Sequence, residues 1–263
     1  MADQVLLSAG PNNIEACVQL ATQHDLGIEM MAFALPAVLD GSWQALVDSY
    51  RVLLAPLRGP RALHGPFFDM APGSLDAQIN ALCSARFRQA LDIAAALDAR
   101  TVVLHANFIA SMRNHEYRTG WHQRNLAFWP PIGDYAAERG VTIAVENMWE
   151  FNPTILSELL AGLDHPNIRA CIDVGHAHLF SDVPFDDWLG ALGPWIVHVH
   201  INNNDGIFDV HRPLAEGVLD YTRILPQLRA LPHSPTLTLE MDSPADMALS
   251  LPFLELAPLS TDR

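Results

Sequence analysis

Nine side chains of metal-ligating types recur at one kind of place in this sequence, at the C-terminal ends of short apolar runs or soon after them. They are His64, His105, Glu146, Asp173, His176, His200, Asp209, His211 and Glu240. Neutral histidine nitrogens combined with carboxylate oxygens suit zinc, manganese and similar divalent ions. One such residue alone is more often a satisfied polar side chain or a loop cap. Six separate runs end in a residue of this kind, so a divalent-metal centre is the leading hypothesis.

Two short spacings make the metal hypothesis more specific. Asp173 and His176 follow an apolar run with Asp-x-x-His spacing, and Asp209 and His211 form an Asp-x-His in a later loop. In both pairs a hard oxygen ligand stands beside a nitrogen ligand. The alternative for the first pair is an aspartate that caps the following turn. The alternative for the second pair is a solvated loop.

Paired residues within apolar runs carry the next part of the prediction. His198 and His200 are two apart in a strand-like run, so they share one face, and His200 is the better ligand because it lies nearer the C-terminal end. Glu146 and Glu240 each close an apolar run. A carboxylate there is costly to bury unless it is paired or ligating, with a salt bridge or loop cap as the alternative.

Four further residues are predicted to line a substrate pocket beside these candidate ligands. They are Phe67, Asn107, Trp149 and His198. Core packing explains aromatic residues in such places about as well. The polar segment 111–124 is expected to be a solvated loop, with a substrate lid as the alternative.

The elements that must position these residues alternate in type along the chain. Strands are predicted at Val5–Ser8, Gly27–Met31, Ala62–His64, Thr101–His105, Thr142–Glu146, Arg169–Asp173, Ile196–Ile201 and Thr236–Glu240. Helices are predicted between them, at Asn13–His24, Ser42–Leu57, Leu75–Ala99, Gln123–Arg139 and Pro153–Leu163, with Ser74 and Asn152 as N-caps. Eight βα units predict an α/β fold of the (β/α)8 TIM barrel type. The alternative is a doubly wound open sheet, but the first predicted strand is not followed by a glycine-rich phosphate turn.

Length and charge limit the classes of function. The 263 residues suit one domain, 1–263, and the net charge of −15 argues against a nucleic-acid binder, which ordinarily carries a basic stripe. No apolar stretch reaches the ~20 residues of a membrane span. The start of the chain does not resemble a secretory signal, and the three cysteines are scattered. We therefore expect a cytoplasmic protein with a small-molecule partner, and the sequence leaves a homo-oligomer open.

Several stretches resemble the xylose isomerase-like TIM barrel superfamily, which includes endonuclease IV-type abasic-site nucleases and many sugar isomerases and epimerases. The most specific are Cys171–His176, His198–Asn203, Asp209-Val210-His211 and Glu216-Gly217, within a resemblance that runs from Gly27 to Glu240. Endonuclease IV-type members hold a trinuclear zinc cluster, and the resemblance maps its nine ligands onto the nine candidates named above. Sugar-epimerase relatives use four ligands, which map onto Glu146, Asp173, His200 and Glu240.

The resemblance implies two chemistries. In an isomerase or epimerase, Glu146 and Glu240 exchange protons on opposite faces of an enediolate while His176 orients the substrate. In a phosphodiesterase, clustered metal ions supply hydroxide and neutralise the phosphate. The acidic charge favours the first, with a sugar or sugar phosphate as substrate and one to three zinc or manganese ions per chain. The complete ligand set favours the second, an AP endonuclease-like phosphoesterase. The third alternative is a metal-binding barrel without turnover.

Overall fold

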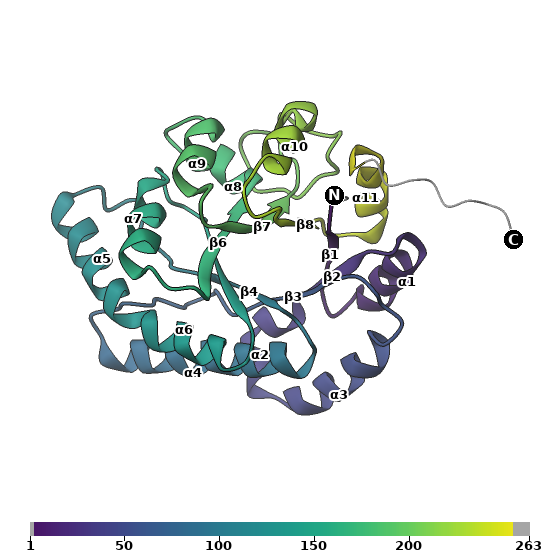
Figure 1. Cartoon of the computed structure of the whole chain (residues 1–263), viewed down its shortest axis with the longest axis horizontal. Helices are drawn as coiled ribbons and strands as arrows, with labels where there is room; N and C mark the ends of the chain where they lie inside the picture. Colours follow the sequence, from purple (N-terminus) through teal and green to yellow (C-terminus); the bar gives the residue numbers. More distant parts are fainter. Residues whose placement is uncertain (1–2, 255–263) are drawn as a thin grey trace, which may run out of the picture.

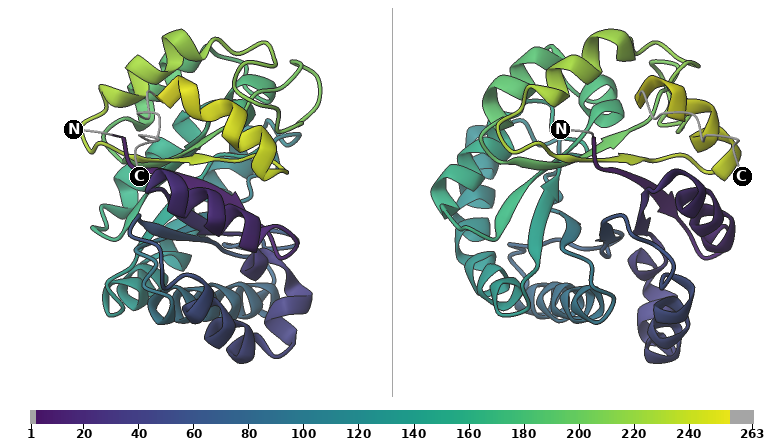
Figure 2. Two further views of the ribbon diagram at one scale, coloured as in Figure 1. Left: turned by 90° about the vertical axis from the view of Figure 1, so that its right-hand side faces the viewer. Right: turned by 45° about the vertical axis from the view of Figure 1, so that its right-hand side comes forward.

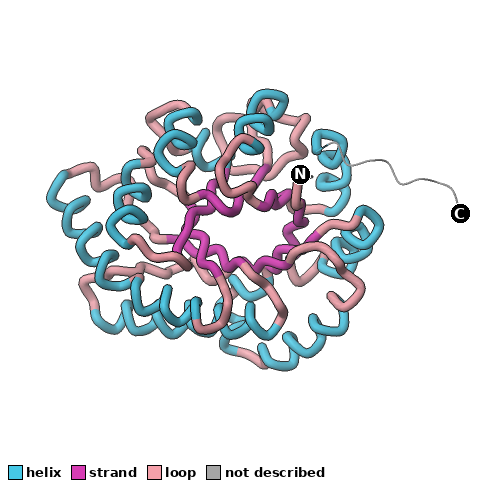
Figure 3. The backbone as a smooth tube through the Cα atoms, in the orientation of Figure 1, coloured by secondary structure: helices cyan, strands magenta, loops and turns pink. Residues whose placement is uncertain are grey.

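A closed barrel of eight parallel strands, hydrogen-bonded in sequence order, forms the centre of the computed structural model, which describes residues 3–254 (Figures 1 and 3). The strands are β1 (Val5–Ala9), β2 (Gly27–Met30), β3 (Arg61–His64), β4 (Thr101–His105), β5 (Thr142–Glu146), β6 (Ile168–Asp173), β7 (Ile196–Ile201) and β8 (Thr236–Leu239). Near-continuous apolar runs form these strands because parallel strands are buried on both faces. The predicted barrel is confirmed, and each predicted strand is present with ends that differ by at most one residue.

Helices surround the barrel and cover its outer face (Figure 2). They are α1 (Ile14–His24), α2 (Pro36–Asp40), α3 (Trp43–Leu53), α4 (Ala77–Ala96), α5 (His115–Phe128), α6 (Pro130–Ala137), α7 (Thr154–Leu163), α8 (Val174–Leu179), α9 (Phe185–Leu192), α10 (Tyr221–Arg229) and α11 (Pro244–Ser250), with short 3-10 helices η1 (Ala32–Ala34) and η2 (Leu251–Leu254). Their apolar faces pack against the strands in one continuous core that includes Trp129 and Trp188. Within the described residues, no helix has the length and apolar character needed to cross a membrane.

The segment after β4 differs from the prediction. The polar stretch 111–124 is not a loop throughout, because α5 begins at His115, where the Asn114 side chain accepts a hydrogen bond from the backbone N–H of Tyr117 at 2.7 Å. The single helix predicted over Gln123–Arg139 is instead two helices. Pro130 begins the second, since proline has no N–H to continue the ladder of the first. A continuous run of helix-forming residues concealed this break.

Two helix starts also differ in detail. Asp76, not Ser74, caps α4, and its carboxylate accepts from the N–H of Gln78 at 2.7 Å. The Ser74 hydroxyl lies just before this cap and accepts from the N–H of Asp76. Asn152 does accept from the N–H of Thr154 at 2.9 Å, although it lies one residue before the position that caps α7.

The strand register brings candidate ligands together. His105 at the end of β4 pairs with Glu146 at the end of β5, and Asp173 at the end of β6 pairs with His200 in β7. Side chains at matched positions of neighbouring parallel strands point to the same side of a sheet. The C-terminal end of the barrel therefore gathers residues that are far apart in the sequence, as is usual for the functional face of this architecture.

Candidate metal centre

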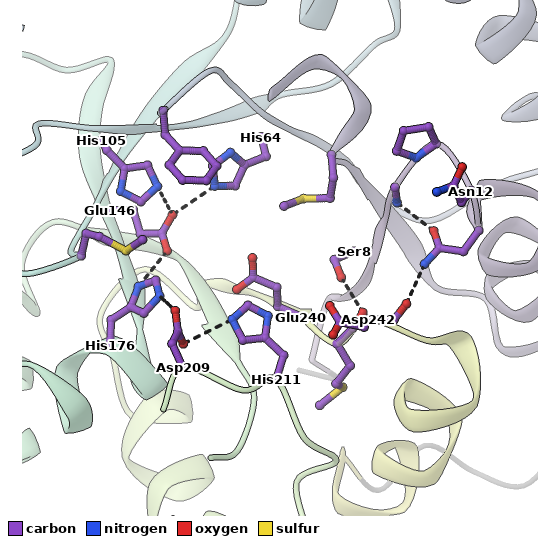
Figure 4. A pocket seen from close by; sticks show the side chains of 17 residues that line it. Ser8, Asn12, His64, His105, Glu146, His176, Asp209, His211, Glu240 and Asp242 are labelled. Carbon is purple, nitrogen blue, oxygen red and sulfur yellow. Dashed lines mark hydrogen bonds and ion pairs between the residues drawn. The ribbon is translucent and has the colours of Figure 1, made fainter. Parts of the chain in front are cut away.

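Glu146 lies in the middle of a cluster of histidines at the barrel mouth (Figure 4). Its Oε2 atom is 2.9 Å from His105 Nε2 and 3.4 Å from His64 Nε2. Its Oε1 atom is 3.2 Å from His200 Nδ1 and 3.5 Å from His176 Nδ1. The carboxylate is buried, so four imidazoles from four different elements meet at one acidic group.

A second carboxylate reaches the same imidazole from the other side of the mouth. Glu240, which directly follows β8, places its Oε2 atom 3.3 Å from His200 Nδ1. Asp173 is also held nearby, because it caps α8 by accepting from the N–H of His176 at 2.6 Å and also accepts from Asn202 Nδ2 at 3.0 Å. Ligand atoms of four residues lie within 4.8 Å of one another: Glu146, Asp173, His200 and Glu240.

A further group forms between α8 and the loop that follows β7. His176 Nε2 is 3.2 Å from one carboxylate oxygen of Asp209, and His211 Nε2 is 3.4 Å from the other (Figure 4). The ligand atoms of these three residues also lie within 4.8 Å of one another, as do those of His64, His105 and Glu146. The structure thus brings all nine predicted side chains into three adjacent groups, two of which share Glu146.

The loop after β7 is fixed from inside by Asn203. Its side-chain nitrogen donates to the carbonyls of Leu214 at 2.8 Å and Leu219 at 3.0 Å, and its backbone pairs with Arg212 in an isolated antiparallel bridge. Gly217 lies against this side chain so closely that a Cβ atom there would be 2.1 Å from Asn203 Oδ1. Asp209 and His211 therefore project from a braced segment. The sequence analysis noted Asn203 and Gly217 only as parts of a resemblance.

Unpaired buried atoms test whether these residues fit a metal ion. Among the described residues, His105 Nδ1, Glu146 Oε2 and Glu240 Oε2 are buried without a hydrogen-bond partner. Leaving such groups unpaired costs free energy, and two of them are carboxylate oxygens. The two carboxylate oxygens belong to the groups described above, where a divalent cation would supply the missing partner. The mixed nitrogen and oxygen donors fit zinc or manganese.

The acidic groups and imidazoles strongly affect each other's protonation. Burial disfavours the charged form of Glu146, but His105 and His200 outweigh it and hold the pKa of this carboxyl well below its usual range. Burial raises the pKa of Asp173 to about 7, against the effect of His176 and with the help of the nearby Glu240 carboxylate. Protons thus supply the positive charge among these groups, and a divalent cation has to compete with them.

Glu29 in β2 is a buried residue that the sequence analysis did not single out. Its carboxylate lies beneath the cluster, 2.8 Å from His198 Nε2 and 3.1 Å from His200 Nε2, and it accepts a hydrogen bond from Thr238 Oγ1 at 2.6 Å. A carboxylate that accepts from one ring nitrogen of a histidine fixes the tautomer and leaves the other nitrogen for a ligand. A fully buried carboxylate within an apolar strand was the available signal.

A cavity of about 430 Å³ opens above the three groups. Phe67 is on its wall, together with seven of the nine candidate ligands, while Asp173 and His200 lie buried below. The other predicted pocket residues lie elsewhere. Asn107 lines a neighbouring cavity of about 600 Å³, Trp149 is half exposed in the loop after β5, and His198 is buried against Glu29.

Comparisons with known proteins agree with this architecture. A structure of the TTHB071 protein from Thermus thermophilus, described as soaking with ZnCl2, is similar with a TM-score of 0.81 and 28% identity, covering 96% of both chains. A D-tagatose 3-epimerase-like protein has a TM-score of 0.77 at 22% identity, again covering 96% of both chains. The protein MJ1311 of Methanocaldococcus jannaschii is 27% identical over 200 residues, which cover 73% of this chain and 68% of that protein.

The family profile described as xylose isomerase-like TIM barrel matches residues 11–256, which is nearly the whole chain. The structural neighbours share its closed barrel, and one carries the name of a sugar epimerase-like protein. The chain therefore belongs to the xylose isomerase-like TIM barrel family.

Proposed function

We propose that this protein is a divalent-metal-dependent isomerase or epimerase of a sugar or a sugar-like polyol. The observation that carries the proposal is the meeting of two carboxylates, Glu146 and Glu240, at the Nδ1 atom of His200. They come from β5 and from the residue after β8, so they approach the mouth from separate parts of the barrel wall. A substrate carbon held between them has a carboxylate on each side.

The chain's own residues would perform the proton transfers. Glu146, Asp173, His200 and Glu240 would hold a cation, which would polarise the sugar oxygens and acidify the adjacent C–H. One of the two glutamates removes the proton from that carbon, and the other returns a proton on the opposite face. His176, whose pKa burial lowers but Asp173 raises well above its usual range, donates a hydrogen bond that orients the substrate. The epimerase-like neighbour of the same fold supports this assignment.

Exchange of a substrate proton with solvent deuterium tests the proposal directly. Protein loaded with zinc or manganese is incubated with ketoses in D2O, and deuterium incorporation is followed by NMR. We expect exchange by the wild type and a loss of at least about a hundredfold in Glu146→Gln, since general acid–base catalysis contributes ~10²–10⁴-fold. Glu138→Gln, which changes an exposed carboxylate on the outside of the barrel, serves as the control. Equal exchange by Glu146→Gln and wild type would exclude Glu146 as the base.

A second candidate is hydrolysis of a phosphate ester, and the two further ligand groups favour it. A single-metal isomerase has no need of His64 and His105, nor of His176, Asp209 and His211, as ligands. Neighbouring metal ions that share a bridging carboxylate such as Glu146 suit in-line displacement at phosphorus. Metal analysis of the purified protein separates the two. Three ions per chain together with cleavage of bis(p-nitrophenyl) phosphate or abasic-site DNA would support the hydrolase, whereas one ion with deuterium exchange supports the isomerase.

A further inference from the structure

The cavity above the candidate metal centre holds no basic side chain other than histidine. Every one of the chain's fifteen basic residues is an arginine, and within the described residues no arginine lines the cavity. Acidic groups do line it, among them Asp209, Glu240 and Asp242 (Figure 4). Recognition of a phosphate ordinarily uses arginine or lysine in charge-assisted hydrogen bonds. A phosphorylated sugar would therefore have only bound cations and histidines to oppose its charge.

The arginines of the loops around the mouth are engaged with other groups. Arg212, the neighbour of His211, forms an ion pair with Asp205 at 3.2 Å. Arg113, in the loop after β4, forms an ion pair with Asp182 and lies over the ring of Phe151 at 4.2 Å. Redirecting either side chain into the cavity would break these contacts. The polarity of the cavity is therefore that of a site for an uncharged molecule.

Apolar side chains continue from the cavity wall to the solvent. Inside the cavity are Met31, Phe67, Met148 and Met241. Three large aromatic side chains are exposed directly beside wall residues: Phe68 is 56% exposed, Trp149 46% and Phe208 66%. Phe68 packs on the wall residue Phe67 with ring centroids 4.0 Å apart, Trp149 follows Met148, and Phe208 precedes Asp209. We call these three exposed side chains the aromatic rim.

Exposed aromatic residues on separate loops beside one pocket indicate a ligand that extends beyond it. The cavity volume falls in the range of ~300–1,000 Å³ that is usual for sites of drug-sized ligands. A single sugar ring held at the metal centre would not reach the rim. The C–H faces of a second sugar, or an aryl ring, would stack on it in the way aromatic groups pack against one another.

We propose that the substrate is an uncharged glycoside, whose reacting sugar lies in the cavity and whose aglycone, a second sugar or an aryl group, stacks on the aromatic rim. This inference rests on the proposed sugar chemistry for the placement of the reacting ring. It adds the substrate class, and it assigns Phe68, Trp149 and Phe208 to specificity and not to proton transfer.

Binding measurements test the substrate class without requiring turnover. Zinc-loaded protein is titrated with the free sugars glucose, galactose, mannose and xylose, with their phenyl glycosides and 1-phosphates, and with the disaccharides cellobiose and lactose. Binding is followed by saturation-transfer-difference NMR and calorimetry. We expect at least one glycoside or disaccharide to bind roughly three- to tenfold more tightly than its free sugar, and more tightly than the phosphate. Phenyl glycosides and disaccharides distinguish the two kinds of aglycone.

Variants assign the gain to the rim. Trp149→Ala and Phe208→Ala are expected to remove most of the advantage of the glycoside while leaving binding of the free sugar unchanged, and Leu82→Ala, an exposed apolar change on α4, should change neither. Tighter binding of a phosphate, no gain for any glycoside, or a gain that survives both rim substitutions would overturn the inference. Deuterium exchange on a free sugar in the same preparation would still support the proposed function, so the two failures are distinguishable.

Discussion

Glu29 controls the candidate metal centre at the scale of a single residue, although it is not itself in the cavity. Its carboxylate holds the Nε2 side of His200 at 3.1 Å, which directs Nδ1 toward Glu146 and Glu240. We expect Glu29→Gln to weaken zinc binding by ~10- to 100-fold, the usual effect of losing such a partner. Competition against a chromogenic chelator measures the affinity. Glu15→Gln, an exposed change in α1, is the control, and equal affinity in both variants would contradict the assignment.

His211 gives the centre a pH dependence that can be measured at the same scale. Burial lowers its pKa, but the Glu240 carboxylate and the contact with Asp209 outweigh burial and raise it to about 9. Below that pH the imidazole carries a proton that it must lose before it can ligate a cation. Zinc affinity should therefore rise as pH increases from 6 to 8, by up to about tenfold per pH unit for each proton displaced.

Calorimetry in buffers of different ionisation enthalpy counts the protons that zinc binding releases. His211→Ala should release fewer protons than the wild type, while His115→Ala, on the exposed side of α5, should release the same number. A proton count that does not change in His211→Ala would show that this histidine is not displaced by the metal.

The loop after β7 is the element that decides whether the group of His176, Asp209 and His211 forms. Gly217 has no room for a side chain, because a Cβ atom would lie 2.1 Å from Asn203 Oδ1 and 2.4 Å from the Asn204 carbonyl oxygen. We expect Gly217→Ala to displace this loop and to lower the number of bound metal ions per chain. Gly190→Ala in α9 is the matched control, since its added Cβ meets nothing within 4 Å. Metal analysis after gel filtration gives the stoichiometry, and an unchanged value would mean that the loop does not set this group.

The elements also show how far sequence reasoning reaches. Apolar runs with polar ends predict strands and the placement of residues such as Glu146, because burial on both faces and alternation are local constraints. Glu29 escaped notice because its partner His198 is 169 residues away, and nothing near it in the sequence indicates that pairing. The break at Pro130 was missed because the residues on both sides favour helix. Contacts inside the loop after β7 depend on tertiary packing around Asn203.

At the scale of the whole molecule, the centre concentrates four carboxylates and five histidines at one end of the barrel. A cation that binds only the folded protein stabilises it by about 2.7 kcal/mol at a free concentration 100-fold above Kd. For a domain of this size we expect zinc to raise Tm by roughly 5–10 °C over protein treated with a chelator. Differential scanning calorimetry measures the shift, and Glu138→Gln should retain it in full. A chelator that leaves Tm unchanged would argue against a buried metal centre.

Closure of the barrel has a consequence for the order of events during synthesis. The first strand pairs with the last, with Leu6 opposite Thr238, and Glu240 follows that last strand immediately. A ribosome that has released only the first seven strands has delivered His64, His105 and Glu146 but not Glu240. The group that contains Glu240 is therefore assembled last, when translation of the eighth strand is over. Occupancy of this group by a cation would mark a chain whose two edges have already met.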